Sequence, residues 1–241
     1  MDGPTVQLVV TCLVDALAPE VGRAALGVLE DAGCNVEYPE GQTCCGQPAY
    51  NVGLHDEARK MAEHTLDVLG PTEGPIVIPS GSCSLMMSRH YPELFAGTGR
   101  DDEAREVAAR VRELTQFLVD DLGVEPEASC EGCVIAYHHS CHGLRGLGLK
   151  EQAGKLLAGL DTVPLDGAEE CCGFGGLFAV EMPPVSAAIM NEKLDRVEAS
   201  GADTLVGGDV SCLIHMEGGL RRRGSSIEVR HIAEILWRQQ G

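Results

Sequence analysis

Short apolar runs alternate with amphipathic stretches along the chain. Runs of strand length occupy residues 6–10, 35–38, 76–78 and 134–138. Between residues 19 and 32 apolar side chains recur at helical spacing, and a longer helical stretch covers residues 57–69. The order strand, helix, strand, helix predicts an α/β fold, with parallel strands and helices on both faces of the sheet.

The pattern also indicates how the chain is divided. Helix-rich tails are expected at residues 104–122 and 230–240, and residues 123–129 are interpreted as a linker. A chain of 241 residues has room for two ordinary domains. We therefore expect a first domain over residues 1–125 and a second over 130–241.

A repeat of cysteines supports this division. Four cysteines recur after 129, 127, 127 and 129 residues: Cys12, Cys44, Cys45 and Cys83 return as Cys141, Cys171, Cys172 and Cys212. The adjacent pair of each quartet is followed by a glycine, Gly46 or Gly173. Regular displacement over such distances predicts two pseudo-repeated, Rossmann-like halves, each with a small parallel sheet flanked by helices.

The repeated cysteines fall in the loops that follow predicted strands, where parallel sheets gather functional groups. Cysteine thiolates are soft ligands that suit zinc, copper(I) and iron–sulfur clusters, so each quartet is a candidate metal site. Gly46 and Gly173 permit close approach of the backbone to a bulky inorganic core, and are candidate cofactor-binding residues.

Charge and composition narrow the classes of function. Acidic residues outnumber basic ones by 37 to 18, and the net charge of −19 disfavours nucleic acid and anionic lipid surfaces as partners. The one basic cluster, residues 221–223, is interpreted as favourable charge at a helix end or as solvated surface. No apolar run approaches the roughly 20 residues of a spanning helix, and no export signal is visible, so a cytoplasmic protein is expected.

The remaining cysteines and several histidines have other interpretations. Cys34 is expected in the core, while Cys130 and Cys133 are interpreted as incidental, with a redox pair as the alternative. Three histidines flank Cys141, namely His138, His139 and His142, whereas no histidine lies close to Cys12 in the first half. They are candidates for metal ligation, for proton transfer or for hydrogen bonding to a cluster sulfur. His139 and His142 are the candidate catalytic acids.

The cysteine pattern resembles a cysteine-rich domain whose signature runs Cys, Cys-Cys-Gly, Cys-x-x-Cys. This domain occurs twice in one of the subunits of heterodisulfide reductase and in the iron–sulfur subunit of glycolate oxidase. Residues 38–49 and 171–176 are most similar to the lactate utilisation protein A family. Ser80 and Asp209 stand at the penultimate cysteine of the signature, which leaves four thiols in each half.

The resemblance implies a part in oxidising L-lactate to pyruvate alongside two partner proteins, one of them a ferredoxin-like iron–sulfur protein. It further implies one or two iron–sulfur clusters, [4Fe–4S] in type, with zinc as an alternative in one half. We therefore expect an electron-transfer subunit of an oxidoreductase that is not active alone. The alternatives are a zinc-stabilised structural or interaction subunit, and a thiol/disulfide oxidoreductase like heterodisulfide reductase.

Overall fold

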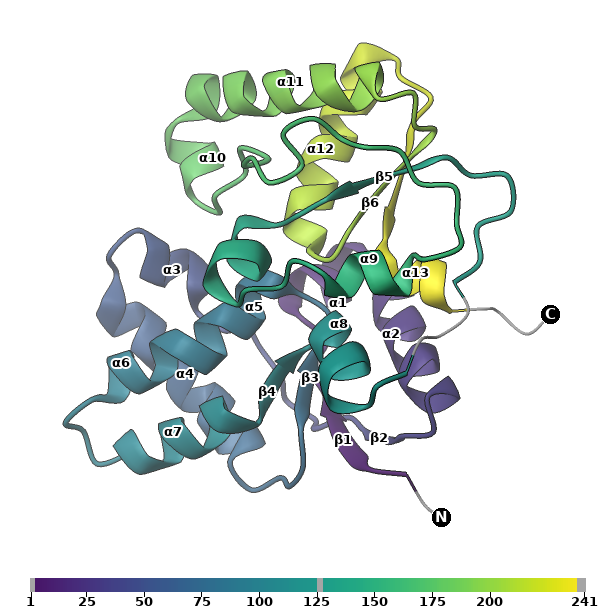
Figure 1. Ribbon diagram of the computed structural model, residues 1–241. Helices are drawn as coiled ribbons and strands as arrows, with labels where there is room; N and C mark the ends of the chain where they lie inside the picture. Colours follow the sequence, from purple (N-terminus) through teal and green to yellow (C-terminus); the bar gives the residue numbers. More distant parts are fainter. Residues whose placement is uncertain (1–2, 125–127, 238–241) are drawn as a thin grey trace.

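The computed structural model describes residues 3–124 and 128–237, which contain two parallel sheets (Figure 1). The first sheet has the strand order β2-β1-β3-β4 and the second has the order β5-β6-β7. The strands are β1 (Thr5–Leu8), β2 (Asn35–Glu37), β3 (Ile76–Ile78), β4 (Val111–Glu113), β5 (Ile135–His138), β6 (Thr204–Gly207) and β7 (Glu228–His231). The mixed α/β fold predicted from the sequence is confirmed.

Helices connect the strands of the first half and cover its sheet. They are α1 (Cys12–Leu17), α2 (Pro19–Asp31), α3 (Gln47–Asn51), α4 (His55–Leu69), α5 (Gly81–Leu85), the π-helix η1 (Met86–His90), α6 (Tyr91–Phe95), α7 (Asp101–Arg110), α8 (Leu114–Gln116) and the π-helix η2 (Phe117–Asp121). Pro19 starts α2, where its missing N–H has no intrahelical partner to lose, and the positive φ of Gly33 lies just beyond the last turn.

The second half has fewer helices than the first among the described residues. They are the π-helix η3 (His142–Gly146), α9 (Gln152–Leu156), α10 (Phe178–Glu181), α11 (Pro183–Ala199), α12 (Val210–Arg223) and α13 (Ile232–Leu236). In Figure 1 this half lies above the first, and α1 and α5 lie at the boundary of the halves, where they contact α12 and η3 respectively.

The two sheets have the same parallel topology, except that the strand equivalent to β2 is reduced to a single bridge in the second sheet. In the first sheet β2 pairs with the outer edge of β1, in register Thr5 with Asn35. In the second sheet the corresponding edge of β5 has only one isolated parallel bridge, between Ile135 and Thr162. A long loop therefore replaces the second strand of the repeat, and it carries the paired cysteines of this half.

A shared core joins the halves. One cluster of buried apolar side chains includes Val6 and Leu114 of the first half together with Ile135, Val206 and Ile232 of the second. The last helix, α13, packs against α2. A Cβ on Gly27 of α2 would overlap the indole of Trp237, so glycine allows this close packing.

Two tails differ from the sequence prediction. The expected helix over 104–122 is interrupted by β4, and the expected helix over 230–240 begins only at Ile232, after β7. Both segments form strands because they pair with a neighbouring strand, β4 with β3 and β7 with β6. The expected linker over 123–129 includes residues 125–127, and the end of the expected tail includes residues 238–240. These lie outside the described residues.

The basic residues 221–223 lie in the last turn of α12, where positive charge is favourable. Arg221 pairs with Glu217, and Arg223 pairs with Asp195 and Glu198. This agrees with the interpretation of the cluster as charge at a helix end. Within residues 3–124 and 128–237, no helix has the length and hydropathy required to cross a bilayer.

Candidate metal centre

The first quartet is assembled at the carboxyl ends of β1 and β3. Cys12 begins α1, whose N-cap Thr11 accepts the Val14 N–H. Cys83 lies in α5, whose N-cap is Ser80. The loop between β2 and α3 supplies Cys44 and Cys45. Two helix starts therefore place Cys12 and Cys83 at the carboxyl ends of neighbouring strands.

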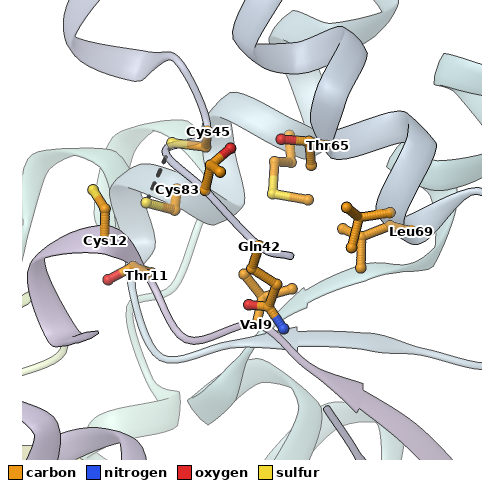
Figure 2. A pocket seen from close by; sticks show the side chains of 11 residues that line it. Val9, Thr11, Cys12, Gln42, Cys45, Thr65, Leu69 and Cys83 are labelled. Carbon is orange, nitrogen blue, oxygen red and sulfur yellow. Dashed lines mark hydrogen bonds between the residues drawn. The ribbon is translucent and has the colours of Figure 1, made fainter. Parts of the chain in front are cut away.

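Figure 2 shows how these side chains lie around a small pocket behind the quartet. Cys12, Cys45 and Cys83 lie together on one side, and Thr65 and Leu69 of α4 lie on the other. The Sγ atoms of Cys45 and Cys83 are 3.3 Å apart. Apolar side chains thus cover the rear of the sulfurs and leave the opposite side open toward the second half.

The second quartet repeats this arrangement at the ends of β5 and β6. Cys141 immediately precedes η3, and Cys212 lies in the first turn of α12, which has Asp209 as its N-cap. The loop before α10 supplies Cys171 and Cys172. The backbone N–H of Gly173 donates to Cys171 Sγ over 3.3 Å.

Both quartets face one cavity of about 230 Å³ between the halves. It is lined by all eight repeated cysteines: Cys12, Cys44, Cys45, Cys83, Cys141, Cys171, Cys172 and Cys212. We call this cavity the cysteine chamber. The sequence repeat indicated two separate quartets, whereas the packing of the halves brings them to opposite walls of a common space.

The glycine after each cysteine pair has a steric reason. Gly46 and Gly173 have φ angles of 87° and 89°, a region that side chains disfavour. A Cβ on Gly46 would lie 2.9 Å from the Ala58 carbonyl oxygen, and one on Gly173 would lie 2.6 Å from that of Ser186. These glycines therefore let each cysteine loop turn tightly against the helix behind it.

Hydrogen bonds within each quartet divide the thiols into donors and acceptors. Bonds from Cys12 and Cys45 lower the pKa of Cys44 to about 2, and the pKa values of both donors rise. In the second half, bonds from Cys141 and Cys172 lower the pKa of Cys171 to about 2 in the same way. The central cysteine of each quartet is thus prepared as a thiolate, the form that binds metal.

The other cysteines lie apart from the chamber. Cys34 is buried in the shared core, as the sequence predicted. Cys130 and Cys133 form a disulfide, and Arg230 Nη1 lies 3.9 Å from Cys130 Sγ. Neither quartet includes this pair.

The three histidines near Cys141 have different surroundings. His142 lines the chamber, and its Nε2 is 3.4 Å from Gln47 Nε2 of the first half. His139 lies elsewhere, in a cavity of about 20 Å³ beside Glu113 and Tyr137. His138 is only 1% exposed, and burial lowers its pKa to about 3, which keeps the imidazole neutral.

A buried lysine also distinguishes the second half. Lys193 of α11 is 1% exposed and donates to the carbonyl oxygens of Gly167 and Ala168, in the loop that leads to Cys171. Burial lowers its pKa to about 8, although the nearby charges of Glu170, Cys172 and Cys212 act in the opposite direction. No sequence pattern marks this residue, because a lysine inside a helical pattern is ordinarily solvated.

Two buried carboxyl groups, those of Asp209 and Glu113, lie near the chamber at the boundary of the halves. Asp209 is 2% exposed, and its Oδ2 accepts the N–H of Ser82 over 2.8 Å. Glu113, at the end of β4, is 3% exposed, and burial raises its pKa to about 7. Asp209 contributes a smaller part of that rise.

Comparison with known proteins agrees with the repeat. The family model of the cysteine-rich CCG domain matches residues 6–88 and 135–217. The chain is 46% identical to lactate utilization protein A of Exiguobacterium sp. over 97% of both chains. It is 45% identical to the proteins of that name from Shouchella clausii and Geobacillus kaustophilus, over 96% of this chain and 98% of each relative. The chain belongs to the lactate utilization protein A family.

The two matched segments correspond to structural units of this family member. The first runs from β1 into η1, and the second runs from β5 into α12. Each therefore contains one complete quartet with the strands and helix starts that position it. Ser80 and Asp209 occupy the position of the penultimate cysteine in the signature. Both have a structural role there, since they cap the helices that carry Cys83 and Cys212.

Proposed function

We propose that the protein is an iron–sulfur electron-transfer subunit of a system that oxidises L-lactate to pyruvate. The cysteine chamber is the observation that carries this proposal, because eight thiols from two quartets line one cavity. Relatives that match nearly the whole chain are named for lactate utilization. Oxidation of lactate to pyruvate releases two electrons and two protons, so an electron carrier is a fitting component of such a system.

The donor set fits iron–sulfur clusters. Four thiols in each half are the number that a [4Fe–4S] cluster uses, and hydrogen bonds from neighbouring thiols lower the pKa values of Cys44 and Cys171. When bound, such clusters accept and release single electrons. The chain would contribute the sulfur ligands, the N–H groups at helix starts that stabilise negative charge, and the tight turns at Gly46 and Gly173.

His142 is the residue best placed to handle protons. It lines the chamber together with the cysteines, whereas His139 lies in a separate cavity. We therefore assign the general-acid role to His142 and retain His139 as the matched comparison. Other subunits, including a ferredoxin-like iron–sulfur protein, would supply and remove the electrons, and the proposed setting is the cytoplasm.

Metal content tests the first part of the proposal. The protein is purified without oxygen, and iron, zinc and acid-labile sulfide are measured together with the absorption spectrum between about 300 and 700 nm. We expect several irons per chain with matching sulfide. The double variants C44A/C45A and C171A/C172A should each lose part of this content, while C34A should retain all of it because Cys34 lies in the core.

The lactate assignment needs a separate measurement. An Exiguobacterium strain that lacks its own lactate utilization protein A is complemented with this protein or with the double variants. We expect the wild-type protein and C34A to restore growth on L-lactate, and each double variant to fail. Clusters without restored growth would leave an electron carrier for another substrate. Zinc without iron would favour the structural alternative.

One observation favours a thiol/disulfide oxidoreductase as the second candidate. Cys130 and Cys133 form a disulfide beside Arg230, and a neighbouring cation stabilises the thiolate that reduction would release. The double variant C130S/C133S tests this alternative. If the iron–sulfur proposal holds, this variant keeps its metal content and still supports growth on lactate.

A further inference from the structure

His138 is a buried imidazole without a hydrogen-bond partner. It ends β5, and neither Nδ1 nor Nε2 has a partner among the described residues. Buried polar atoms are nearly always paired, because an unpaired donor or acceptor loses its hydration without compensation. The imidazole therefore requires a partner that the folded chain does not supply.

Two cysteine sulfurs of the second quartet lie close to this imidazole. One ring nitrogen of His138 and the Sγ atoms of Cys172 and Cys212 all lie within 4.8 Å of one another. The centre of a triangle with edges of 4.8 Å is about 2.8 Å from each corner, whereas zinc bonds measure about 2.0–2.3 Å. A contraction of about half an ångström at each donor would place all three around one metal atom.

The first half lacks such a donor. Counting back from the first cysteine of each quartet, the position equivalent to His138 is Val9. Val9 is buried and lines the pocket behind the first quartet (Figure 2). In the part of the chain that the structure describes, the first-half cysteines do not form a comparable group of three donors. The two walls of the chamber are therefore chemically unequal.

We propose that His138 is a nitrogen ligand of the metal centre in the second half, so that the protein holds two unlike centres. The first has sulfur ligands only, and the second combines imidazole with thiolate. The proposal rests on the proposed function only in taking the quartets as metal sites. Imidazole together with thiolate suits a zinc ion or one iron atom of a cluster, and both share this ligand chemistry.

The experiment isolates the second centre and looks for nitrogen. The C44A/C45A variant, which retains only the second quartet, is loaded without oxygen with Zn²⁺ alone or with Fe²⁺ and sulfide. X-ray absorption at the zinc and iron edges then distinguishes the two metals. We expect a nitrogen neighbour at about 2.0–2.1 Å. In protein with ¹⁵N-labelled histidine, pulsed EPR of a reduced iron centre should show a directly bound nitrogen.

Substitutions at His138 provide the matched controls. His138→Val copies the residue of the first half, and should remove the nitrogen signal and weaken Zn²⁺ binding at least about tenfold. His138→Cys offers a thiolate in its place, and should restore binding with a spectrum of sulfur neighbours only. Val9→Ile, at the equivalent position of the first half, should leave the second centre unchanged.

The outcomes separate this inference from the proposed function. A second centre that binds metal with sulfur neighbours alone, in protein with His138 intact, overturns the inference and leaves the electron-transfer proposal standing. Equal Zn²⁺ affinity in His138→Val and its parent has the same meaning. Wild-type protein that binds neither iron nor zinc would overturn both.

Discussion

The Ser80 hydroxyl donates a hydrogen bond to Asp209 Oδ2 over 3.3 Å. These two residues are 129 positions apart, the displacement that relates Cys12 to Cys141, so equivalent positions of the two halves meet at their boundary. Each also caps a helix that carries a chamber cysteine. The contact therefore fixes the two quartets relative to each other.

Asp209 should matter more for stability than Ser80. Its Oδ2 accepts from Ser82 N and Ser80 Oγ, and its Oδ1 accepts from Ser211 N and Oγ. Because all these partners donate, Asp209→Asn sets an amide N–H₂ against donors, and should lower the free energy of unfolding by about 2–4 kcal/mol. Ser80→Ala should cost about 1 kcal/mol. Urea unfolding measures both, and equal losses would contradict this account.

Glu113 should make stability depend on pH. Its pKa is about 7 in the folded protein against 4.5 ordinarily, mainly because burial disfavours the charge. Between these values the folded protein retains a proton that the unfolded chain releases. The contribution of Glu113 to the free energy of unfolding is therefore fully present below pH 4.5. It is lost as the pH rises to about 7, by at most about 3 kcal/mol.

The variant Glu113→Gln isolates this effect, because an amide oxygen can still accept from Thr115 N at the helix start. Relative to wild type, the variant should gain stability as the pH rises from 4.5 to 7. The comparison must be between variants, since the lowered pKa values of His138 and His231 act in the opposite direction in acid. Parallel stability curves across this range would refute a raised pKa.

Gly46→Ala should reduce metal binding by the first quartet. Gly53→Ala is the control that separates the cost of backbone strain from the cost of a steric clash. Both glycines have φ above 80°, but a Cβ on Gly53 meets nothing within 4 Å, whereas one on Gly46 meets the Ala58 carbonyl. Gly53→Ala should cost about 1–2 kcal/mol for its backbone. Gly46→Ala should cost about 1–3 kcal/mol more and reduce the metal content. Equal stability and metal content in the two variants would exclude the steric role.

His142→Ala and His139→Ala form a matched pair for the proton-transfer hypothesis. His142 lines the chamber, and His139 is in the separate cavity with Glu113. With unchanged metal content, His142→Ala should slow growth on L-lactate about tenfold or more, and His139→Ala should have a smaller effect. Unchanged growth with both variants would dismiss a general acid at either position.

Local sequence pattern was sufficient where a single segment decides its own structure. Residues 76–78 form β3 as predicted, and Pro19 begins α2 as its pattern indicated. The regular displacement of the cysteines predicted both quartets, because a repeat preserves the loop that follows each strand. These features depend on periodicity and on turn residues, which are visible in a short window.

Tertiary contacts decided the remainder. Val111 lies in a helical pattern but pairs with Ile76 in the sheet, so the predicted helix over 104–122 is broken there. The common chamber depends on how the halves pack, and no local pattern reports that. His138 was one of three candidate histidines, and it is separated from His139 and His142 by its burial without a partner and by its closeness to the Cys172 and Cys212 sulfurs.

Lys193 offers a final test of the asymmetry between the halves. The buried positions of α4 and α11 match at a displacement of 128 residues, so the equivalent position in the first half is the buried Thr65 of α4, which precedes Leu66. Lys193→Leu removes the ammonium group and leaves the carbonyls of Gly167 and Ala168 without their donor. It should lower the free energy of unfolding by about 2–4 kcal/mol and loosen the loop before Cys171.

Metal binding should separate the two quartets in this variant. Since the loop belongs to the second half alone, Lys193→Leu should lose metal from the second quartet and retain it in the first. Leu66→Met, at a buried position of α4, is the control in the first half, and should cost less than about 1.5 kcal/mol without loss of metal from either quartet. Metal analysis in the C44A/C45A and C171A/C172A backgrounds assigns the loss. If Lys193→Leu retained the second metal at full occupancy, the buried ammonium group would have no part in holding that site.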